Sequence, residues 1–243
     1  MSAHPGSGNG ATWAVIPAAG IGSRMGSKLP KQYLEVCDAP LIVHTIHAIA
    51  QFKPLQGILV GLSPDDRWWS EAKAQLRGIG CPLIVYEGGA ERADTVLLGL
   101  EKISASSKVA NWALVHDAVR PLVRRGDIEN LVDLVSGNPD GGLLAQPVAD
   151  TLKSEIDGCS NGTVDRSHLW RALTPQYFPV DRLMQALRKS KAQGVVVTDE
   201  ASAMESIGAR PRLIVGHTDN IKITYPSDLE LASLLLASRK DTE

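Results

Sequence analysis

A glycine-rich segment near the amino terminus contains the first residues whose types suit chemistry on a phosphate. The segment runs from Pro17 to Gly26, reads PAAGIGSRMG and follows the apolar stretch 13–16. Glycine has no Cβ, so a loop of this kind can bring backbone N–H groups close to a phosphate chain. Arg24 within the segment and Lys31 just after it would add positive charge. The segment therefore predicts a loop that holds the phosphates of a nucleotide.

The spacing of these glycines differs from two familiar phosphate-binding motifs. Gly20, Gly22 and Gly26 give G-x-G-x-x-x-G, whereas the dinucleotide-binding fingerprint is G-x-G-x-x-G. Neither Gly20 nor Gly22 is followed at the required distance by the Gly-Lys pair of the P-loop. A glycine-rich turn is also compatible with a tight loop that binds nothing. A second group of polar residues is needed before a ligand is assigned.

Further polar residues follow predicted strands elsewhere in the chain. Residues 116–120 read HDAVR, residues 88–92 read GGAER, and Lys222 lies within a predicted strand over 220–224. In doubly wound sheets, ligands bind beyond the carboxyl ends of the strands, so these residues are expected to meet there. Asp117 with Arg120 could form a merely structural ion pair, and Lys222 could face solvent from an edge strand. Their joint occurrence instead suits a polyphosphate with a divalent metal ion.

Alternating strands and helices must position these residues. The predicted strands are 13–16, 57–62, 82–85, 112–115, 142–147, 212–215 and 220–224. The predicted helices are 41–52, 66–77, 92–103, 127–135, 181–192, 200–207 and 227–237. Alternation of this kind is typical of parallel βαβ units. The sequence therefore predicts an α/β fold with a Rossmann-like, doubly wound, mostly parallel sheet.

One polar stretch, residues 150–168, interrupts this alternation. It contains Asp157-Gly158 and Asn161-Gly162, two dipeptides typical of β-hairpin turns. A polar excursion of this length inside an α/β domain is usually functional or an interaction element. We therefore expect a protruding β-arm over about 150–168.

Composition and charge exclude several classes of protein. Of the 243 residues, 44% are hydrophobic and 21% are charged, which is ordinary for a globular domain. The net charge of −2 provides no basic field for nucleic acid, and no apolar stretch has the length of a membrane span. Three widely spaced cysteines without C-x-x-C predict reduced thiols in a cytoplasmic protein. Residues 1–11 are expected to be a disordered tail before a single domain over 12–243.

The order of these motifs resembles one family of enzymes. The matching segments are 17–24 (PAAGIGSR), 30–33 (PKQY), 88–100 (GGAERADTVLLGL), 116–121 (HDAVRP), 147–151 (PVADT), 165–170 (DRSHLW), 173–178 (LTPQYF), 198–202 (TDEAS) and 220–224 (NIKIT). Together they resemble the 2-C-methyl-D-erythritol 4-phosphate cytidylyltransferases. The resemblance implies transfer of CMP from CTP to that acceptor in non-mevalonate isoprenoid synthesis. It also implies a fold of the nucleotide-diphospho-sugar transferase type, Mg²⁺, and a homodimer with exchanged arms.

The resemblance also implies roles for individual residues. Arg24, Lys31 and Lys222 would be catalytic. CTP would be bound by Pro17, Ala18, Ala19, Gly20, Gly89, Ala90, Arg92, Thr95 and Ala118. The acceptor would be bound by Asp117, Arg120, Thr151, Arg166, Thr174, Thr198 and Lys222, with Arg166 and Thr174 coming from the partner's arm region. Mg²⁺ would be held mainly by the phosphates of CTP, with Asp117 as its protein ligand.

The implied reaction is consistent with the residues present. A phosphomonoester is largely dianionic at neutral pH, because its second pKa is near ~6. Such an acceptor needs positioning and charge neutralisation rather than a general base or a covalent nucleophile.

Two alternatives stay open from the sequence. Ribitol 5-phosphate cytidylyltransferases share much of this layout, but they often have Leu-Ala-Gly-Gly in the loop and Phe at the position of Tyr33. The second alternative is a catalytically dead nucleotide-binding protein, against which the presence of Arg24, Lys31 and the other charged residues argues.

Overall fold

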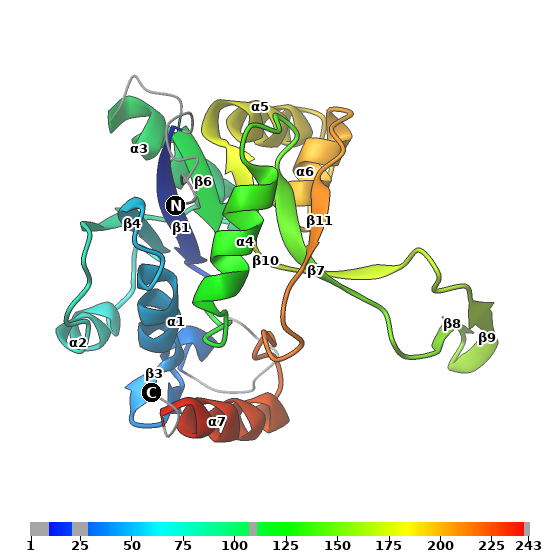
Figure 1. Cartoon of the computed structure of the whole chain (residues 1–243), viewed down its shortest axis with the longest axis horizontal. Coiled ribbons are helices and arrows are strands. Elements are labelled where there is room, and N and C mark those ends of the chain that lie inside the picture. Colours follow the sequence, from blue (N-terminus) through cyan, green and yellow to red (C-terminus); the bar gives the residue numbers. More distant parts are fainter. Residues whose placement is uncertain (1–9, 21–28, 107–110, 241–243) are drawn as a thin grey trace, which may run out of the picture.

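A seven-stranded sheet forms the centre of the part of the chain that this computed structural model describes, residues 10–20, 29–106 and 111–240 (Figure 1). Its strands are β1 (Ala11–Ala18), β4 (Leu55–Leu62), β5 (Leu83–Glu87), β6 (Asn111–Val115), β7 (Gly142–Pro147), β10 (Trp170–Pro179) and β11 (Arg212–Val215). They lie in the order β11-β7-β10-β6-β1-β4-β5. Strand β10 is antiparallel to both neighbours, whereas the remaining pairs are parallel.

Helices cover both faces of the sheet. One face packs against α1 (Leu41–Ala50), α2 (Trp69–Ala74) and α4 (Arg125–Val135), and the other against α3 (Arg92–Ser106), α5 (Val180–Ala192) and α6 (Glu200–Ser206). Alternate side chains of β1 enter the two cores, with Ile16 in the first and Val15 in the second. The predicted α/β fold with a doubly wound, mostly parallel sheet is therefore confirmed.

A third, smaller core lies under α7 (Pro226–Lys240). It combines Val36 of the short β2 (Glu35–Val36), Ile223 and Ala232. β2 pairs with β3 (Ala39–Pro40), and the short 3₁₀ helix η2 (Lys31–Tyr33) precedes it. Among the described residues, no helix combines the length and apolar character that a membrane crossing requires.

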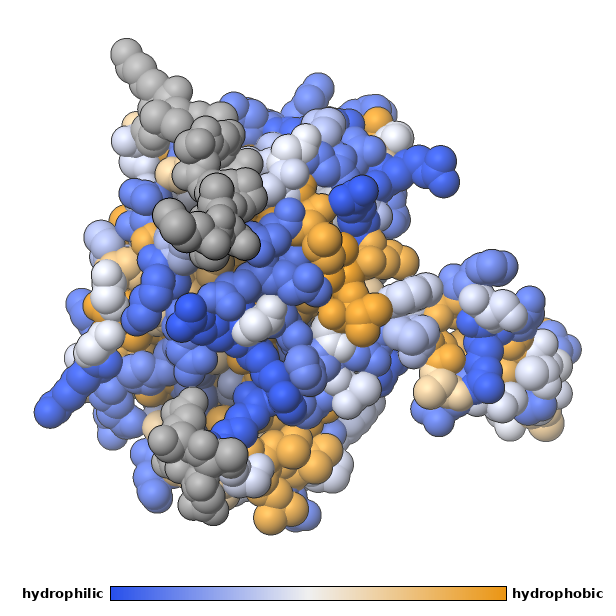
Figure 2. All heavy atoms as spheres, in the orientation of Figure 1, coloured by the Kyte–Doolittle hydropathy of each residue, from blue (hydrophilic) through white to orange (hydrophobic). Residues whose placement is uncertain are grey.

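The predicted arm is present as a two-stranded antiparallel hairpin, β8 (Leu152–Ile156) and β9 (Cys159–Val164). It projects from the side of the body and stands apart from it in the space-filling view (Figures 1 and 2). Asp157 and Gly158 form its turn with φ values of 50° and 77°, the backbone that a two-residue hairpin turn requires. Asn161-Gly162, the second hairpin signal, lies within β9 instead.

Two features of the fold correct the predictions. The strand predicted over 220–224 is absent, and that segment has no regular secondary structure. Its buried residues, Asn220 and Ile223, are three positions apart, whereas the buried residues of a strand alternate every two positions. Conversely, β10 was not predicted, although it occupies the middle of the sheet. Pro175 and Pro179 within it argue against a central strand, because proline has no N–H to donate to a neighbouring strand. The pairing of β10 with β7 shifts register between Ala172 and Gln176, which accommodates Pro175.

Candidate active site

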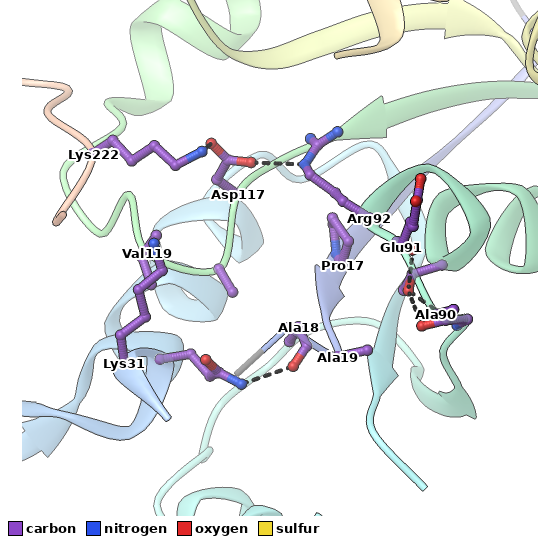
Figure 3. Close-up of a pocket in the computed structure, with 15 residues that line it drawn as sticks. Pro17, Ala18, Ala19, Lys31, Ala90, Glu91, Arg92, Asp117, Val119 and Lys222 are labelled. Atoms are coloured by element: carbon purple, nitrogen blue, oxygen red, sulfur yellow. Dashed lines mark hydrogen bonds and ion pairs between the residues drawn. The ribbon is translucent and has the colours of Figure 1, made fainter. Parts of the chain in front are cut away.

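A pocket lies at the carboxyl ends of β1, β5 and β6, where a doubly wound sheet places its ligands (Figure 3). Its lining residues are Pro17, Ala18, Ala19, Gly20, Lys31, Gln32, Gly89, Ala90, Glu91, Arg92, Thr95, Asp117, Ala118, Val119 and Lys222. Of these, Gln32, Glu91 and Val119 were not among the predicted site residues. The structure therefore brings together residues from distant parts of the sequence, from Pro17 to Lys222.

Close packing holds one wall of the pocket against the amino terminus of α3. A Cβ added to Gly88 would lie 2.6 Å from the Cβ of Ala19, and one added to Gly89 would lie 2.3 Å from the Cβ of Asp94. The Gly89 N–H donates to the Thr95 hydroxyl at 3.1 Å, and that hydroxyl lies 3.1 Å from the Glu91 carbonyl. The two glycines are thus required for a close approach of three segments.

Side chains from neighbouring elements hold the opposite wall. Gln32, buried in η2, donates its side-chain N–H to the Ala18 carbonyl at 2.8 Å. Thr45 of α1 donates its hydroxyl to the Ala118 carbonyl at 3.0 Å. Gln32 was not predicted, although its place beside Lys31 in the PKQY segment was a usable signal. These bonds place the end of β1 next to η2, and so bring Lys31 to the pocket.

The Asp117 carboxylate is surrounded by cations. It accepts from Arg92 Nε at 3.1 Å, from Arg120 Nε at 3.2 Å and from Lys222 Nζ at 3.0 Å. Arg92 and Lys222 approach it from opposite sides (Figure 3). Burial alone would raise the pKa of Asp117, but the neighbouring cations outweigh that effect and hold the pKa well below its usual range. Asp117 is therefore ionised and joins three cations at one place.

A second carboxylate, Glu200, holds Arg92 from behind. Its two oxygens accept from Arg92 Nη1 at 2.6 Å and from Nη2 at 3.1 Å, and its side chain is only 1% exposed. Glu200 is the first residue of α6, whose cap is formed by Asp199 and Ser202. Sequence reasoning missed Glu200, because an acidic residue in the first turn of a helix is already explained by the helix dipole.

Three of the predicted acceptor-binding residues do not line the pocket but lie next to residues that support it. Two of them contact the segment around Asp117, and the third lies beside α6. Arg120 is buried and donates from Nη1 to the Asn220 carbonyl at 2.8 Å. Thr174, expected from the arm region, lies instead in β10 of the central sheet, 4% exposed beneath Asp117. Thr198 precedes α6, and its main-chain N–H donates to Ser202.

Two predicted acceptor-binding residues do not line this pocket in their own subunit. Thr151 and Arg166 flank the arm strands and are exposed. Arg24 lies outside the described residues, as does most of the loop that was predicted to hold phosphates.

The carboxylates of the pocket do not fit a Mg²⁺ ion at Asp117. Both of its oxygens already accept from cations, and a divalent ion there would lie beside three positive charges. Within residues 10–20, 29–106 and 111–240, no three His, Cys, Asp or Glu side chains form a metal-binding group. The three cations around Asp117 instead suit the binding of an anion.

Comparisons with known proteins show which family this chain resembles over nearly its whole length. The profile of the 2-C-methyl-D-erythritol 4-phosphate cytidylyltransferase family matches residues 12–238. A protein of that name from Acidithiobacillus ferrooxidans is 48% identical over 231 residues, 94% of this chain and 98% of the relative. One from Hahella chejuensis is 45% identical over 225 residues, 92% of each chain.

Solved structures show the same likeness. The crystal structure of the cytidylyltransferase from Francisella tularensis superposes with a TM-score of 0.77 at 30% identity. The match covers 92% of this chain and 98% of that one. The profile match and the two relatives each span nearly the whole chain. The chain therefore belongs to the 2-C-methyl-D-erythritol 4-phosphate cytidylyltransferase family.

Proposed function

We propose that this chain transfers CMP from CTP to 2-C-methyl-D-erythritol 4-phosphate, releasing pyrophosphate in non-mevalonate isoprenoid precursor synthesis. The family match and the names of the relatives support this assignment. The structural observation that carries it is the charge of the pocket. Lys31, Arg92 and Lys222 line it, and its buried carboxylate, Asp117, is neutralised by cations.

The pocket provides what attack by one phosphate on another requires. An oxygen of the acceptor phosphate forms a bond to the α-phosphorus of CTP, while the bond from that phosphorus to the bridging oxygen breaks and pyrophosphate leaves. Among the described residues that line the pocket, there is no Ser, Cys or His that could act as a nucleophile or base. A dianionic phosphate needs neither, and catalysis then depends on positioning and on neutralising charge.

The positions of the residues within the pocket suggest which of them bind CTP and which bind the acceptor. The end of β1, with Pro17, Ala18, Ala19 and Gly20, and the segment from Gly89 to Arg92 form the CTP side. Lys31, with Arg24, would neutralise charge at the α-phosphorus. Lys222 and Asp117 form the acceptor side, where the ammonium group holds the acceptor phosphate and the carboxylate receives an acceptor hydroxyl.

Mg²⁺ enters this proposal as a partner of CTP. Because Asp117 does not fit a metal ion, the phosphates of CTP and water would supply its ligands, as is common for this ion. Bound in that way, it would neutralise part of the triphosphate charge. Loss of turnover in EDTA and its recovery with excess Mg²⁺ test this requirement.

Features of the arm support the proposal of a homodimer in which each subunit completes the other's site. Apolar side chains of the arm and its base are exposed, Ile156 by 56%, Val164 by 38% and Trp170 by 38%. Arg166 lies on this arm, outside the lining of its own pocket. We infer that the arm packs on a second copy and carries Arg166 to that copy's acceptor side.

Subunit complementation tests this arrangement. We expect Lys222→Gln and Arg166→Gln to be inactive alone. Mixed dimers would contain one complete site, so an equal mixture would recover about a quarter of wild-type activity. No recovery in dimers shown to exchange subunits would contradict exchange of Arg166. A variant in which a short turn replaces residues 152–164 should also become monomeric, and full activity as a dimer would refute the proposal.

The acceptor is tested by pyrophosphate release with CTP and Mg²⁺. We expect turnover with 2-C-methyl-D-erythritol 4-phosphate and little with ribitol 5-phosphate. The opposite preference would assign the chain to ribitol phosphate activation, and release with neither would indicate a nucleotide-binding protein without this activity.

Three free cysteines, Cys37, Cys81 and Cys159, are consistent with action in the cytoplasm.

A further inference from the structure

A fully buried histidine, His116, lies directly behind the pocket and has no place in the transfer chemistry described above. It follows β6, next to Asp117, and its exposed fraction is 0%. Its Nδ1 lies 2.9 Å from the Thr174 hydroxyl, and its Nε2 lies 3.0 Å from the Arg120 carbonyl. The main-chain N–H of Asp117 donates to the same Thr174 hydroxyl at 3.1 Å. A buried ring with two specific partners is suited to holding other groups in place.

The partners of His116 determine which of its nitrogens carries the proton. A carbonyl oxygen can only accept, so Nε2 must donate to Arg120. In a neutral ring Nδ1 then accepts, and the Thr174 hydroxyl donates to it. The hydroxyl oxygen keeps a lone pair for the Asp117 N–H. This pattern satisfies every donor and acceptor, whereas a doubly protonated ring would leave the hydroxyl proton of Thr174 without an acceptor.

The same neutral form follows from the surroundings of the ring. Burial lowers the pKa of His116 to about 4. Arg120 and Arg92 also oppose a positive charge there, although Asp117 and the Arg120 carbonyl favour one. At neutral pH the ring is therefore a fixed donor at one nitrogen and a fixed acceptor at the other.

The contacts of His116 extend to both acceptor-side groups of the pocket. Through Thr174 they reach the main chain of Asp117. Through Arg120 they reach the segment that carries Lys222, because Arg120 Nη1 donates to the Asn220 carbonyl and Asn220 Nδ2 donates to the Thr174 carbonyl at 2.8 Å. That segment has no strand partner, and Lys222 is held between buried Asn220 and buried Ile223, whose N–H donates to the Val119 carbonyl.

We propose that His116 is a positioning residue that sets Asp117 and Lys222 for the acceptor through Thr174 and Arg120. The proposal rests on the proposed transfer reaction. A positioning role should affect the acceptor far more than CTP, because Ala18 and Gly89 on the CTP side are held by Gln32 and Thr95. Arg92 also bonds to Asp117, but both oxygens of Glu200 hold its guanidinium in place. A role in overall stability alone would instead lower the amount of active enzyme and leave both KM values unchanged.

Two pairs of variants separate the two arms of this network. Thr174→Val removes the hydroxyl, while Thr174→Ser keeps it. His116→Asn places an acceptor near the position of Nδ1, and His116→Gln places a donor near the position of Nε2. We expect Thr174→Val and His116→Gln to lower kcat/KM for the acceptor about tenfold, the size of one lost hydrogen bond, with KM for CTP unchanged. Thr174→Ser should stay within about threefold of wild type.

A double variant and a matched control complete the test. Because Thr174→Val already removes the link that His116→Gln breaks, the double variant should lose little more than Thr174→Val alone. His44→Asn, which removes another histidine–carbonyl contact, at Val36, should leave both KM values unchanged. Wild-type kcat/KM in Thr174→Val, or fully additive losses, would overturn the proposal.

Nitrogen NMR of labelled protein tests the tautomer without relying on activity. We expect His116 to be neutral and protonated at Nε2, and a ring protonated at Nδ1 would overturn the proposal. Failure of wild-type protein to use 2-C-methyl-D-erythritol 4-phosphate would refute the proposed function instead, and the tautomer and the coupling of the two variants in thermal unfolding would then still report on the network.

Discussion

Replacing Glu200 by Gln tests whether the buried contact behind the pocket holds Arg92 in place. The Glu200 carboxylate is 1% exposed and both of its oxygens accept from Arg92. Glutamine has nearly the same shape but carries no charge, and its NH₂ group would face a guanidinium N–H. The substitution therefore turns one of the two bonds into a repulsive contact and leaves the other with a neutral acceptor in place of the carboxylate.

The expected cost follows from the burial of the two partners. Breaking a buried ion pair by removing one partner costs roughly 3–5 kcal/mol, because the other charge stays buried. Arg92 is 30% exposed and keeps its bond to Asp117, so part of its charge is still compensated. We therefore expect a loss of about 3 kcal/mol, near the lower limit of that range.

Urea unfolding of purified protein measures this loss. The control is Glu101→Gln, because Glu101 also pairs with an arginine, Arg188, at 2.8 Å, but the two side chains are 39% and 57% exposed. Exposed pairs contribute about 0–1 kcal/mol, so the control should unfold close to wild type. If Glu200→Gln loses no more stability than Glu101→Gln, the buried pair does not fix Arg92 and the reasoning fails.

Three further predictions concern the same region. Gly88→Ala should destabilise by about 1–3 kcal/mol in thermal unfolding, because its Cβ would lie 2.6 Å from Ala19, and adding Ala19→Gly should recover part of the loss. Lys222→Gln should lower acceptor turnover on the order of 10²-fold, with exposed Lys189→Gln as an unaffected control. The low pKa of His116, about 4, stabilises the fold above pH ~6.5, so the stability of wild type relative to His116→Asn should fall by about 3 kcal/mol from pH 6.5 to 4. A difference that does not change with pH would contradict this last prediction.

The sequence predicted where the pocket lies because its residues follow strand ends. Asp117 comes after β6 and Arg92 begins α3, so a parallel sheet brings them together whatever the details of packing. Glu200 could not be paired with Arg92 in this way, since the two residues are 108 positions apart and meet only through packing of α6. Thr174 was placed in the arm region by the family resemblance, and the local sequence did not correct this placement because Pro175 argues against the central strand that contains both residues.

The segment around Lys222 shows a second limit of pattern reading. Alternation of polar and apolar residues predicted a strand over 220–224, yet no ladder forms there. Asn220 is held by Thr174 and Arg120, and Ile223 packs in the core under α7. Local periodicity does not encode these contacts with distant parts of the chain. The position of the lysine was predictable, but the way in which it is held was not.

Strand β10 connects two distant parts of the molecule. Its outer end, Trp170, lies at the base of the arm, and its inner end, Pro179, leads into α5. Between them, pairing to β7 is interrupted beside Thr174, and pairing to β6 begins at Gln176. The arm and the hydroxyl that bonds to Asp117 therefore lie on one stretch of backbone, only four residues apart at Trp170 and Thr174. Whatever fixes the position of the arm thus also borders on the residue that supports the acceptor side of the pocket.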